Sequence, residues 1–382
     1  MSTVADPLAE LRRRTSEKWS AYPADVLPMF IAEMDFPLAP AIKAALHEAV
    51  EAGDTGYVNL ADTRAAAAFA AFAAGAWGWA PRVDRMAATT DVSVVIVEAL
   101  RRLARPGDGV IITPPVYPPF FALLPEAGTT VVEVPLLDDG TAYALDLAGI
   151  DRALAAGARG VLLCNPHNPV GLVHGRAELA ELAAIVARHD GFVISDEIHA
   201  PLTHAGQSFT PYLAVSDQAR EHAIAAESGS KAFNLAGLKT AFFVAESDRM
   251  AGLVTALPED VIYRAGLFGL IATAAGFTDG RQWLRETVAT VEGNLALLER
   301  QLAASLPVVR VRRPAASYLA WLDLSALGWG EDPARFALEH ARVALSNGLA
   351  FGPQGAGHAR VNLACAPETV TEAVARLARA AR

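Results

Sequence analysis

Lys231 stands in a segment whose residue types suit covalent chemistry. It lies within residues 227–234, among serines and a glycine, directly after an apolar run. Partial burial beside small residues disfavours the ammonium form and leaves an amine that can form a Schiff base. Ser228 and Ser230 offer hydroxyl donors and Lys239 a second positive charge, a combination suited to a phosphate group. A surface loop with the same pattern is the alternative interpretation.

Two polar side chains that suit a nitrogen heterocycle follow separate apolar runs. Asp196 follows residues 191–195, and a buried carboxylate there needs a cationic partner, for which a protonated pyridine nitrogen would serve. Helix capping is its competing role, and His199, three residues later, is either a ring contact or a structural histidine. Asn168 lies in residues 165–171, where two Asn-Pro steps force a turn. A rigidly held amide of this kind can donate to a phenolate oxygen.

Three further segments carry groups for an anion, a ring and a carboxylate. Residues 89–93 precede a helical pattern at 94–103, so free amides at the helix start can bind a phosphate, although the acidic Asp91 favours plain capping. Tyr117 stands among four prolines and suits stacking on a flat ring or loop packing. Arg360 precedes an apolar stretch and suits a bidentate grip on a carboxylate or a surface ion pair. Each group therefore has an ordinary structural role as its alternative.

Short apolar runs alternate with helical patterns through the middle of the chain. The runs that stop at polar or Gly/Pro residues are 109–113, 160–164, 191–195 and 222–226, and residues 176–189 are helix-like. Continuous apolar strands alternating with helices predict a mainly parallel sheet covered on both faces. In such sheets, ligands bind beyond the carboxyl ends of the strands. The residues expected to meet there are Tyr117, Asn168, Asp196, His199 and Lys231.

The pattern changes toward the C-terminus. The stretches that read as strands between helices are 308–311, 318–322, 349–352 and 359–363. They predict a smaller α+β unit, joined by the N-terminal forty residues, in which residues 1–20 show a charged helical pattern. We therefore expect a large domain at 41–280 and a small domain made of 1–40 and 281–382.

Composition excludes several classes of protein. Of 382 residues, 53% are hydrophobic and 19% charged, which excludes global disorder, and the net charge of −10 has the wrong sign for binding nucleic acid or anionic lipid. Two cysteines, Cys164 and Cys365, exclude a disulfide framework and a Cys-rich zinc cluster, and no metal site is expected. The alanine-rich residues 65–80 fall short of the ~20 that a membrane span needs and read as a buried helix. We expect a cytoplasmic protein.

Four strings together resemble a known family. NPHNPVG, SDEIH, SGSKAFNLAGLK and ARVNLA, in this order and spacing, resemble fold-type I pyridoxal-5′-phosphate (PLP) enzymes of the class I/II aminotransferase superfamily. Residues 27–36 (LPMFIAEMDF), Gly56-Tyr57 and the Asp-Glu-Ile-His run resemble its cystathionine β-lyase (C–S lyase) subgroup, which includes MalY and PatB. The resemblance implies an α/β fold with a mainly parallel seven-stranded sheet in the large domain, a smaller α+β domain, and PLP as the cofactor.

The resemblance also implies a role for each motif residue. Lys231 would form the Schiff base and shuttle the proton, Asp196 would pair with the pyridinium nitrogen, and Tyr117 would stack on the ring. Asn168 would bind the ring oxygen, with His199 nearby. The phosphate would be held by Val92, Ser93, Ser228, Ser230, Lys239 and, from the neighbouring subunit of a homodimer, Tyr57. The substrate would meet Arg360, at its α-carboxylate, and Ala32.

The implied reaction is α,β-elimination from cystathionine or a related cysteine S-conjugate, giving a thiol, pyruvate and ammonia. Three alternatives stay open: an aminotransferase, a specialised biosynthetic enzyme acting on a thiol conjugate, and a PLP-containing regulatory protein. Three departures from the subgroup's pattern bear on the substrate, namely Asp91 within Thr-Asp-Val-Ser, Pro201 and Phe209.

Overall fold

The computed structural model describes residues 3–382 and is built around one large sheet. Its strand order is β2-β10-β9-β8-β7-β3-β4. The strands are β2 (Met86–Thr89), β3 (Gly109–Ile112), β4 (Thr130–Glu133), β7 (Gly160–Cys164), β8 (Phe192–Asp196), β9 (Ala223–Glu227) and β10 (Ala241–Val244). Strands β4, β3, β7, β8 and β9 run parallel, whereas β10 is antiparallel to both of its neighbours. The predicted mainly parallel sheet of seven strands is confirmed.

Both faces of this sheet are buried under helices. On β7, Val161 and Leu163 belong to the core of one face, and Leu162 and Cys164 to the core of the other, as the two-residue period of a strand requires. Helix α8 (Arg176–Arg188) packs on the first face, and α5 (Val92–Leu103) on the second. This double coverage explains why the strands read as continuous apolar runs. The other helices around the sheet are α6 (Phe120–Glu126), α7 (Leu147–Ala155), α9 (Asp217–His222), α10 (Asp248–Thr255) and α11 (Glu259–Tyr263).

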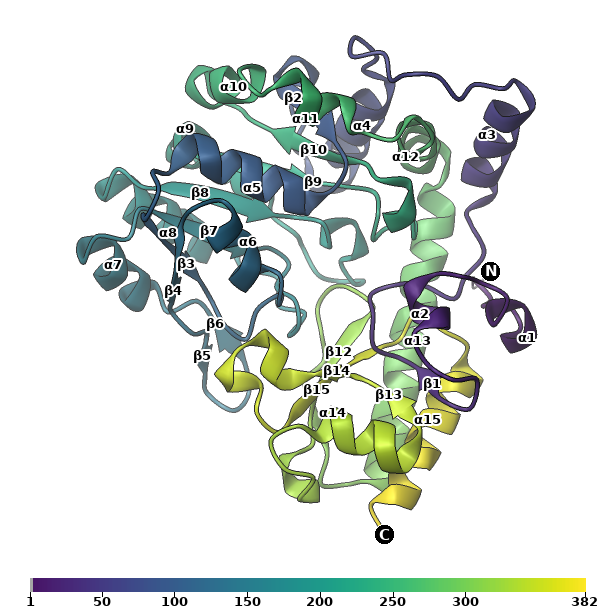
Figure 1. The fold of residues 1–382 in the computed structure, drawn as a ribbon. Helices are drawn as coiled ribbons and strands as arrows, with labels where there is room; N and C mark the ends of the chain where they lie inside the picture. The colour runs from purple at the N-terminus through teal and green to yellow at the C-terminus, as the bar shows by residue number, and fades with distance from the viewer. Residues whose placement is uncertain (1–2) are drawn as a thin grey trace.

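Three helices pack together at one end of the large sheet (Figure 1). They are α3 (Pro40–Glu51), α4 (Arg64–Trp77) and α12 (Leu267–Asp279). Helix α4 is the buried, alanine-rich helix that the sequence predicts, with Phe69 and Ala73 fully enclosed. Within residues 3–382, no helix has the length and apolar character needed to cross a bilayer.

A smaller sheet lies beside the large one, in the order β11-β12-β15-β14. Its strands are β11 (Arg310–Val311), β12 (Leu319–Asp323), β14 (Ser346–Asn347) and β15 (His358–Asn362). Figure 1 shows the long helix α13 (Arg281–Ser305) running past both regions, and α15 (Pro367–Ala380) packs against it. The N-terminal segment joins this region through the pairing of β1 (Leu27–Pro28) with β13 (Val343–Ala344). The domain boundaries near residues 40 and 280 stay a prediction.

Two local predictions are wrong. Residues 349–352 do not form a strand, because Gly348–Phe351 make a 3-10 helix whose first turn is capped by Asn347, with its Oδ1 2.9 Å from the Leu349 nitrogen. Glycine at position 348 permits this packing, since a Cβ there would lie 2.1 Å from the Gly355 carbonyl oxygen.

The N-terminal segment does not form one continuous helix. Met1 and Ser2 lie outside the described residues, and only α1 (Leu8–Leu11) and α2 (Glu17–Ser20) are helical. The chain bends between them because Arg14 bonds to Asp6 and to the Met34 carbonyl, while buried Lys18 pairs with Asp35 at 2.8 Å. Tertiary contacts thus replace the local helical preference.

Candidate active site

A cavity of 280 Å³ lies beyond the carboxyl ends of β7, β8 and β9, next to the start of α5. It gathers motifs that are far apart in the sequence. The predicted site residues that line it are Ala32, Val92, Ser93, Tyr117, Asn168, Asp196, His199, Ser230, Lys231, Lys239 and Arg360. The parallel sheet brings the strand ends together, as expected for this class of fold.

The Lys231 amine faces the main chain of the N-terminal segment. Its Nζ lies 3.4 Å from the Ala32 carbonyl oxygen. Burial, followed by the positive charge of Arg360, lowers the pKa of Lys231 to about 8, while Asp196 acts in the opposite direction. A substantial fraction of this side chain is therefore a neutral amine near pH 8, the form that acts as a nucleophile or a base.

Asp196 ends β8 and has only 4% of its surface exposed. Its Oδ1 accepts a hydrogen bond from the Ile198 amide at 3.2 Å, which holds the turn after β8, while the next 3-10 helix starts at Ala200 with His199 as its N-cap, so Asp196 does not cap a helix. Burial raises the pKa of Asp196 to about 7, and the charge of Lys231 only partly offsets this effect. A cationic ring nitrogen would supply the partner that this carboxylate needs to stay ionised.

Arg360 and Asn168 are joined directly inside the cavity. Arg360 Nη1 donates to Asn168 Oδ1 at 2.8 Å, and Nη2 donates to the Phe30 carbonyl and to Ser346 Oγ at 3.2 and 3.1 Å. The guanidinium also lies over the Phe351 ring, 4.9 Å from its centre. Burial lowers the pKa of Arg360 to about 10, which leaves it charged at neutral pH. Because the Asn168 oxygen is already an acceptor, its amide nitrogen is the group left to donate to a ligand oxygen.

The start of α5 provides donors for an anion. Val92 and Ser93 occupy its first turn, where amides have no acceptor within the helix. Asp91 turns back to cap the helix, with Oδ1 3.1 Å from the Val94 nitrogen, and its Oδ2 lies 3.6 Å from Lys239 Nζ. Asp91 therefore caps the helix and lies beside the Lys239 ammonium at this site.

Ser230 and Ser228 are placed differently. Ser230 lines the cavity, whereas Ser228 is buried outside the lining residues. The Ser228 hydroxyl donates to the Thr240 carbonyl at 2.7 Å and accepts from the Ser230 amide at 3.0 Å. In this chain Ser228 thus holds the loop that presents Ser230.

Tyr117 and His199 are uncharged walls of the cavity. Burial raises the pKa of the Tyr117 phenol to about 12 and lowers that of His199 to about 3. Tyr117 packs edge-on against Phe120, and within residues 3–382 His199 Nδ1 has no hydrogen-bond partner. Tyr57 is 96% exposed and lies outside the residues that line this cavity.

The main chain of residues 29–36 borders the cavity at Ile31 and Ala32, and side chains hold it there through contacts that sequence reasoning missed. Tyr318 Oη donates to the Ala32 carbonyl at 2.9 Å. Asn234 bonds to both the nitrogen and the carbonyl of Met34, at 2.9 and 3.1 Å. Asn362 Nδ2 donates to the carbonyls of Ile31 and Glu33.

Some of these contacts had a usable signal. Asn234 and Asn362 stand inside the strings SGSKAFN and ARVNLA, so their positions beside Lys231 and Arg360 marked them. Ser346 lies in β14 and Tyr318 directly precedes β12, and nothing in their local sequence announces a contact with the N-terminal segment.

The departures at Pro201 and Phe209 lie away from this cavity. Pro201 belongs to the 3-10 helix Ala200–Leu202, and Phe209 packs against the Trp77 ring with centroids 5.0 Å apart. Neither lines the cavity. Of the three departures, only Asp91 touches the site.

The donor set of the cavity fits PLP. Each reactive group of PLP has a counterpart in the cavity. The amine suits the aldehyde, and the buried acid suits the pyridine nitrogen. The free amide nitrogen suits the phenolate oxygen, and the helix start beside a lysine suits the phosphate. The groups that match in this order are Lys231, Asp196, Asn168, and Val92 and Ser93 with Lys239.

Comparisons with known proteins agree with this geometry. The chain matches the family described as aminotransferase class I and II over residues 26–377. It is 43% identical to a putative cystathionine beta-lyase of Mycobacterium leprae, covering 98% of this chain and 96% of that one. It is 32% identical to cystathionine beta-lyase PatB of Bacillus subtilis, over 92% of each chain.

A solved structure extends the agreement to three dimensions. A putative PLP-dependent beta-cystathionase from Corynebacterium diphtheriae has a TM-score of 0.94 and 32% identity, with 99% of each chain covered. The chain therefore belongs to the class I and II aminotransferase family, as its motifs predict.

Proposed function

We propose that this protein is a PLP-dependent carbon–sulfur β-lyase. It cleaves cystathionine or a related cysteine S-conjugate by α,β-elimination and gives a thiol, pyruvate and ammonia. The observation that carries the proposal is the meeting of Lys231, Asp196 and Arg360 in one cavity. The choice of a lyase rests on relatives that match nearly the whole chain and are named cystathionine beta-lyases.

The chain's own groups divide the work. When bound, PLP supplies a ring that accepts the electron pair left on the substrate α-carbon. Lys231 Nζ takes the α-proton, because its lowered pKa leaves a neutral amine close to neutral pH. Asp196 holds the ring nitrogen protonated by providing an ionised partner. Elimination then breaks the bond between the β-carbon and sulfur, and the sulfur takes up a proton and leaves as the thiol. Hydrolysis of the remaining three-carbon fragment by one water molecule gives pyruvate and ammonia.

Substrate orientation falls to the other wall of the cavity. Arg360 is charged, buried and held by Ser346 and the Phe30 carbonyl, so it offers a fixed guanidinium to an α-carboxylate. Ala32 leaves room on the substrate side because its side chain is a single methyl group. The neutral Tyr117 and His199 rings border the ligand without adding charge.

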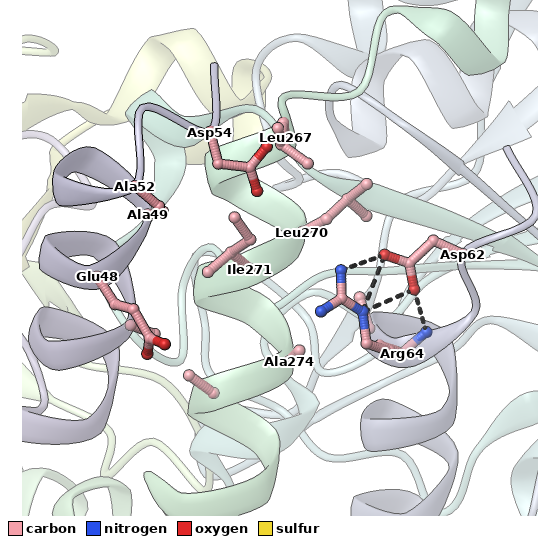
Figure 2. Close-up of a pocket in the computed structure, with 13 residues that line it drawn as sticks. Glu48, Ala49, Ala52, Asp54, Asp62, Arg64, Leu267, Leu270, Ile271 and Ala274 are labelled. Carbon is pink, nitrogen blue, oxygen red and sulfur yellow. Dashed lines mark hydrogen bonds and ion pairs between the residues drawn. The ribbon is translucent and has the colours of Figure 1, made fainter. Parts of the chain in front are cut away.

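We further propose that two copies form a homodimer, with Tyr57 contacting the phosphate in the partner's cavity. Exposed apolar side chains stand along this segment, with Val50 at 58%, Tyr57 at 96% and Leu60 at 40% exposure. A hollow of 380 Å³ lies between α3, α12 and the start of α4. Figure 2 shows Ile271 projecting into it. Such surfaces are typical of subunit interfaces.

The homodimer has its own test. Light scattering of the purified protein should give twice the mass of one chain. Replacing Tyr57 with Phe should weaken PLP binding in the dimer while leaving its mass unchanged. A monomer that is fully loaded with PLP and active would contradict the proposal. We also propose a cytoplasmic location, from the scarcity of cysteine.

The activity is tested by a substrate comparison. The PLP-loaded protein is incubated with L-cystathionine or S-alkyl cysteines, and pyruvate is measured with a coupled dehydrogenase. Stoichiometric release of pyruvate and thiol is the expected result. Conversion of bound PLP to its pyridoxamine form by an amino donor, without pyruvate, would replace the lyase with an aminotransferase.

A further inference from the structure

Two glutamates that the proposed reaction does not use are buried beside the cavity. Glu197 and Glu227 both have 0% of their surface exposed. Glu197 directly follows β8, and Glu227 is the last residue of β9. The pairing of Asp196 with Ala226 and the hydrogen bond from the Glu197 nitrogen to the Ala226 carbonyl, at 3.0 Å, bring the two glutamates side by side.

The hydrogen bonds around the two carboxyl groups are very unequal. Glu197 Oε1 accepts from Ser195 Oγ at 2.7 Å, from the Tyr212 nitrogen at 2.8 Å and from Asn165 Nδ2 at 3.5 Å. Within residues 3–382, Glu197 Oε2 and both Glu227 oxygens are buried without a hydrogen-bond partner. One carboxyl is therefore well supplied with donors, and the other has none.

A proton shared between the two carboxyl groups reconciles them. Two ionised carboxylates are both acceptors, so they cannot bond to each other, and a buried acceptor without a donor is costly. The donors around Glu197 mark it as the anion. The lack of donors around Glu227 marks it as the acid.

We propose that Glu227 is a neutral carboxylic acid that donates a hydrogen bond to Glu197 Oε2, and that this bond positions Asp196 and Lys231 for the cofactor. Glu197 follows Asp196 in the chain, and Glu227 lies four residues before Lys231. A bond between the two glutamates ties the carboxyl ends of β8 and β9 together. It therefore fixes the spacing of two side chains that must meet one ring.

The dyad lies across the sheet from the cofactor residues. On β8, Ile194 packs on the face covered by α5, and Val193 packs on the opposite face. Alternation places Asp196 with Ile194, and the Ser195 hydroxyl reaches Glu197 on the other side. Glu227 therefore does not touch the ligand, and its role is that of a positioning residue.

The charges around Glu227 agree with a neutral acid. Burial, and then the negative charges of Glu197 and Asp196, raise the pKa of Glu227 well above the ordinary value. On the other side, β10 places the apolar Phe242 opposite Glu227. Burial raises the pKa of Glu197 to about 7, but hydrogen bonds from Tyr212 and Ser195 favour its ionised form.

The protonation state is tested by infrared spectroscopy of the PLP-loaded protein at neutral pH. Wild type should show a protonated-carboxyl band that Glu227→Gln lacks. Persistence of an identical band in Glu227→Gln would refute the assignment. This readout does not depend on which reaction the enzyme catalyses, so it separates failure of this inference from failure of the lyase proposal.

The positioning role is tested with two substitutions of similar size. Gln keeps a neutral donor toward Glu197, whereas Leu removes it. PLP titration should give an affinity for Glu227→Gln within about threefold of wild type and a loss of about tenfold for Glu227→Leu. Equal losses in both variants, or no loss in either, would overturn the role. If Glu227→Leu does not fold, wild-type-like affinity in Glu227→Gln still supports the role, and a tenfold loss in it refutes the role.

The pH dependence of unfolding gives an independent check. A group whose folded pKa is raised contributes stability that is lost as pH rises toward that pKa. Glu227→Gln has no proton to lose at this position, while Glu197 and Asp196 titrate in both proteins. The Tm of wild type should therefore fall relative to that of Glu227→Gln between pH 5 and pH 9. Parallel Tm curves would contradict a titrating acid at position 227.

Discussion

The cavity has two walls, and they contribute different groups. The large sheet forms one wall, and residues 29–36 with the smaller sheet form the other. The large sheet presents side chains at the ends of strands, with Asp196 at the end of β8 and Lys231 shortly after β9. The opposite wall presents main-chain carbonyls, at Phe30 and Ala32, to Arg360 and Tyr318. Side chains supply the chemistry on one wall, and hydrogen-bonded backbone supplies the geometry on the other. Substitutions on the first wall should mainly change kcat, and those on the second should mainly change KM.

The largest effect is expected for Lys231→Ala. Without the amine there is neither a Schiff-base partner nor a base for the α-proton, so kcat for pyruvate release should fall by at least about 10³-fold. Steady-state kinetics on the PLP-loaded protein measure the change. The exposed Lys43→Ala is the matched control and should behave as wild type. A Lys231→Ala protein with more than a tenth of normal activity would show that Lys231, on the large sheet's wall, does not carry out the chemical step.

Asp196→Asn should lower kcat by about 10²-fold with little change in KM. The amide preserves the shape of the side chain but cannot stabilise a protonated ring nitrogen. The absorption spectrum of bound PLP, recorded alongside the kinetics, separates a change of ring protonation from a loss of cofactor. Unchanged kinetics in a fully loaded Asp196→Asn protein would show that this carboxylate does not act on the ring.

On the second wall, Arg360→Ala should raise KM by about 10- to 100-fold, the range expected for losing hydrogen bonds to a charged group. Arg360→Lys should recover only part of this loss, because an ammonium cannot form two parallel hydrogen bonds with a carboxylate. An Arg360→Ala protein that loses kcat but keeps a normal KM would contradict the division between the walls.

Schiff-base formation should depend on pH through Lys231. Because the pKa of Lys231 is lowered to about 8, the neutral amine is the minor form at pH 7 and the major form at pH 9. The rate of PLP incorporation into the cofactor-free protein should therefore rise about tenfold over this interval. Stopped-flow absorbance gives the rate. A rise of about a hundredfold would show that Lys231 keeps the ordinary basicity of a lysine, and a flat rate would show that it does not change charge in this range.

The smallest effect is expected for Tyr318→Phe, which removes the hydrogen bond to the Ala32 carbonyl and leaves the ring in place. One neutral hydrogen bond has a net value of about 1 kcal/mol, so KM should rise about fivefold while kcat stays near normal. Equal falls in kcat and kcat/KM would instead place Tyr318 in the chemical step.

These two walls also differ in how far the sequence predicts them. Asp196 stands directly after an apolar run and Lys231 a few residues after the next one, so the rule that ligands bind at the carboxyl ends of parallel strands locates them. Arg360 was found through a motif, but its partner Ser346 lies on another strand and has no local signal. Glu227 stood within the motif segment, yet its lack of donors is visible only in three dimensions.

The failed local predictions have the same origin. Residues 349–352 have the composition of a strand, but the close approach of Gly348 and Gly355 and the cap from Asn347 favour a 3-10 helix. The N-terminal residues have a helical pattern, but the buried pair Lys18–Asp35 bends the chain onto the cavity wall. In both cases long-range contacts outweigh local propensity.

The central claim is that Lys231 is the residue to which PLP is covalently attached in this cavity. Borohydride reduction of the PLP-loaded protein, followed by proteolysis and mass spectrometry, tests it directly. The account predicts one pyridoxyl adduct per chain, on the peptide that carries Lys231. An adduct on Lys239 alone, or a loaded protein without any adduct, would contradict it.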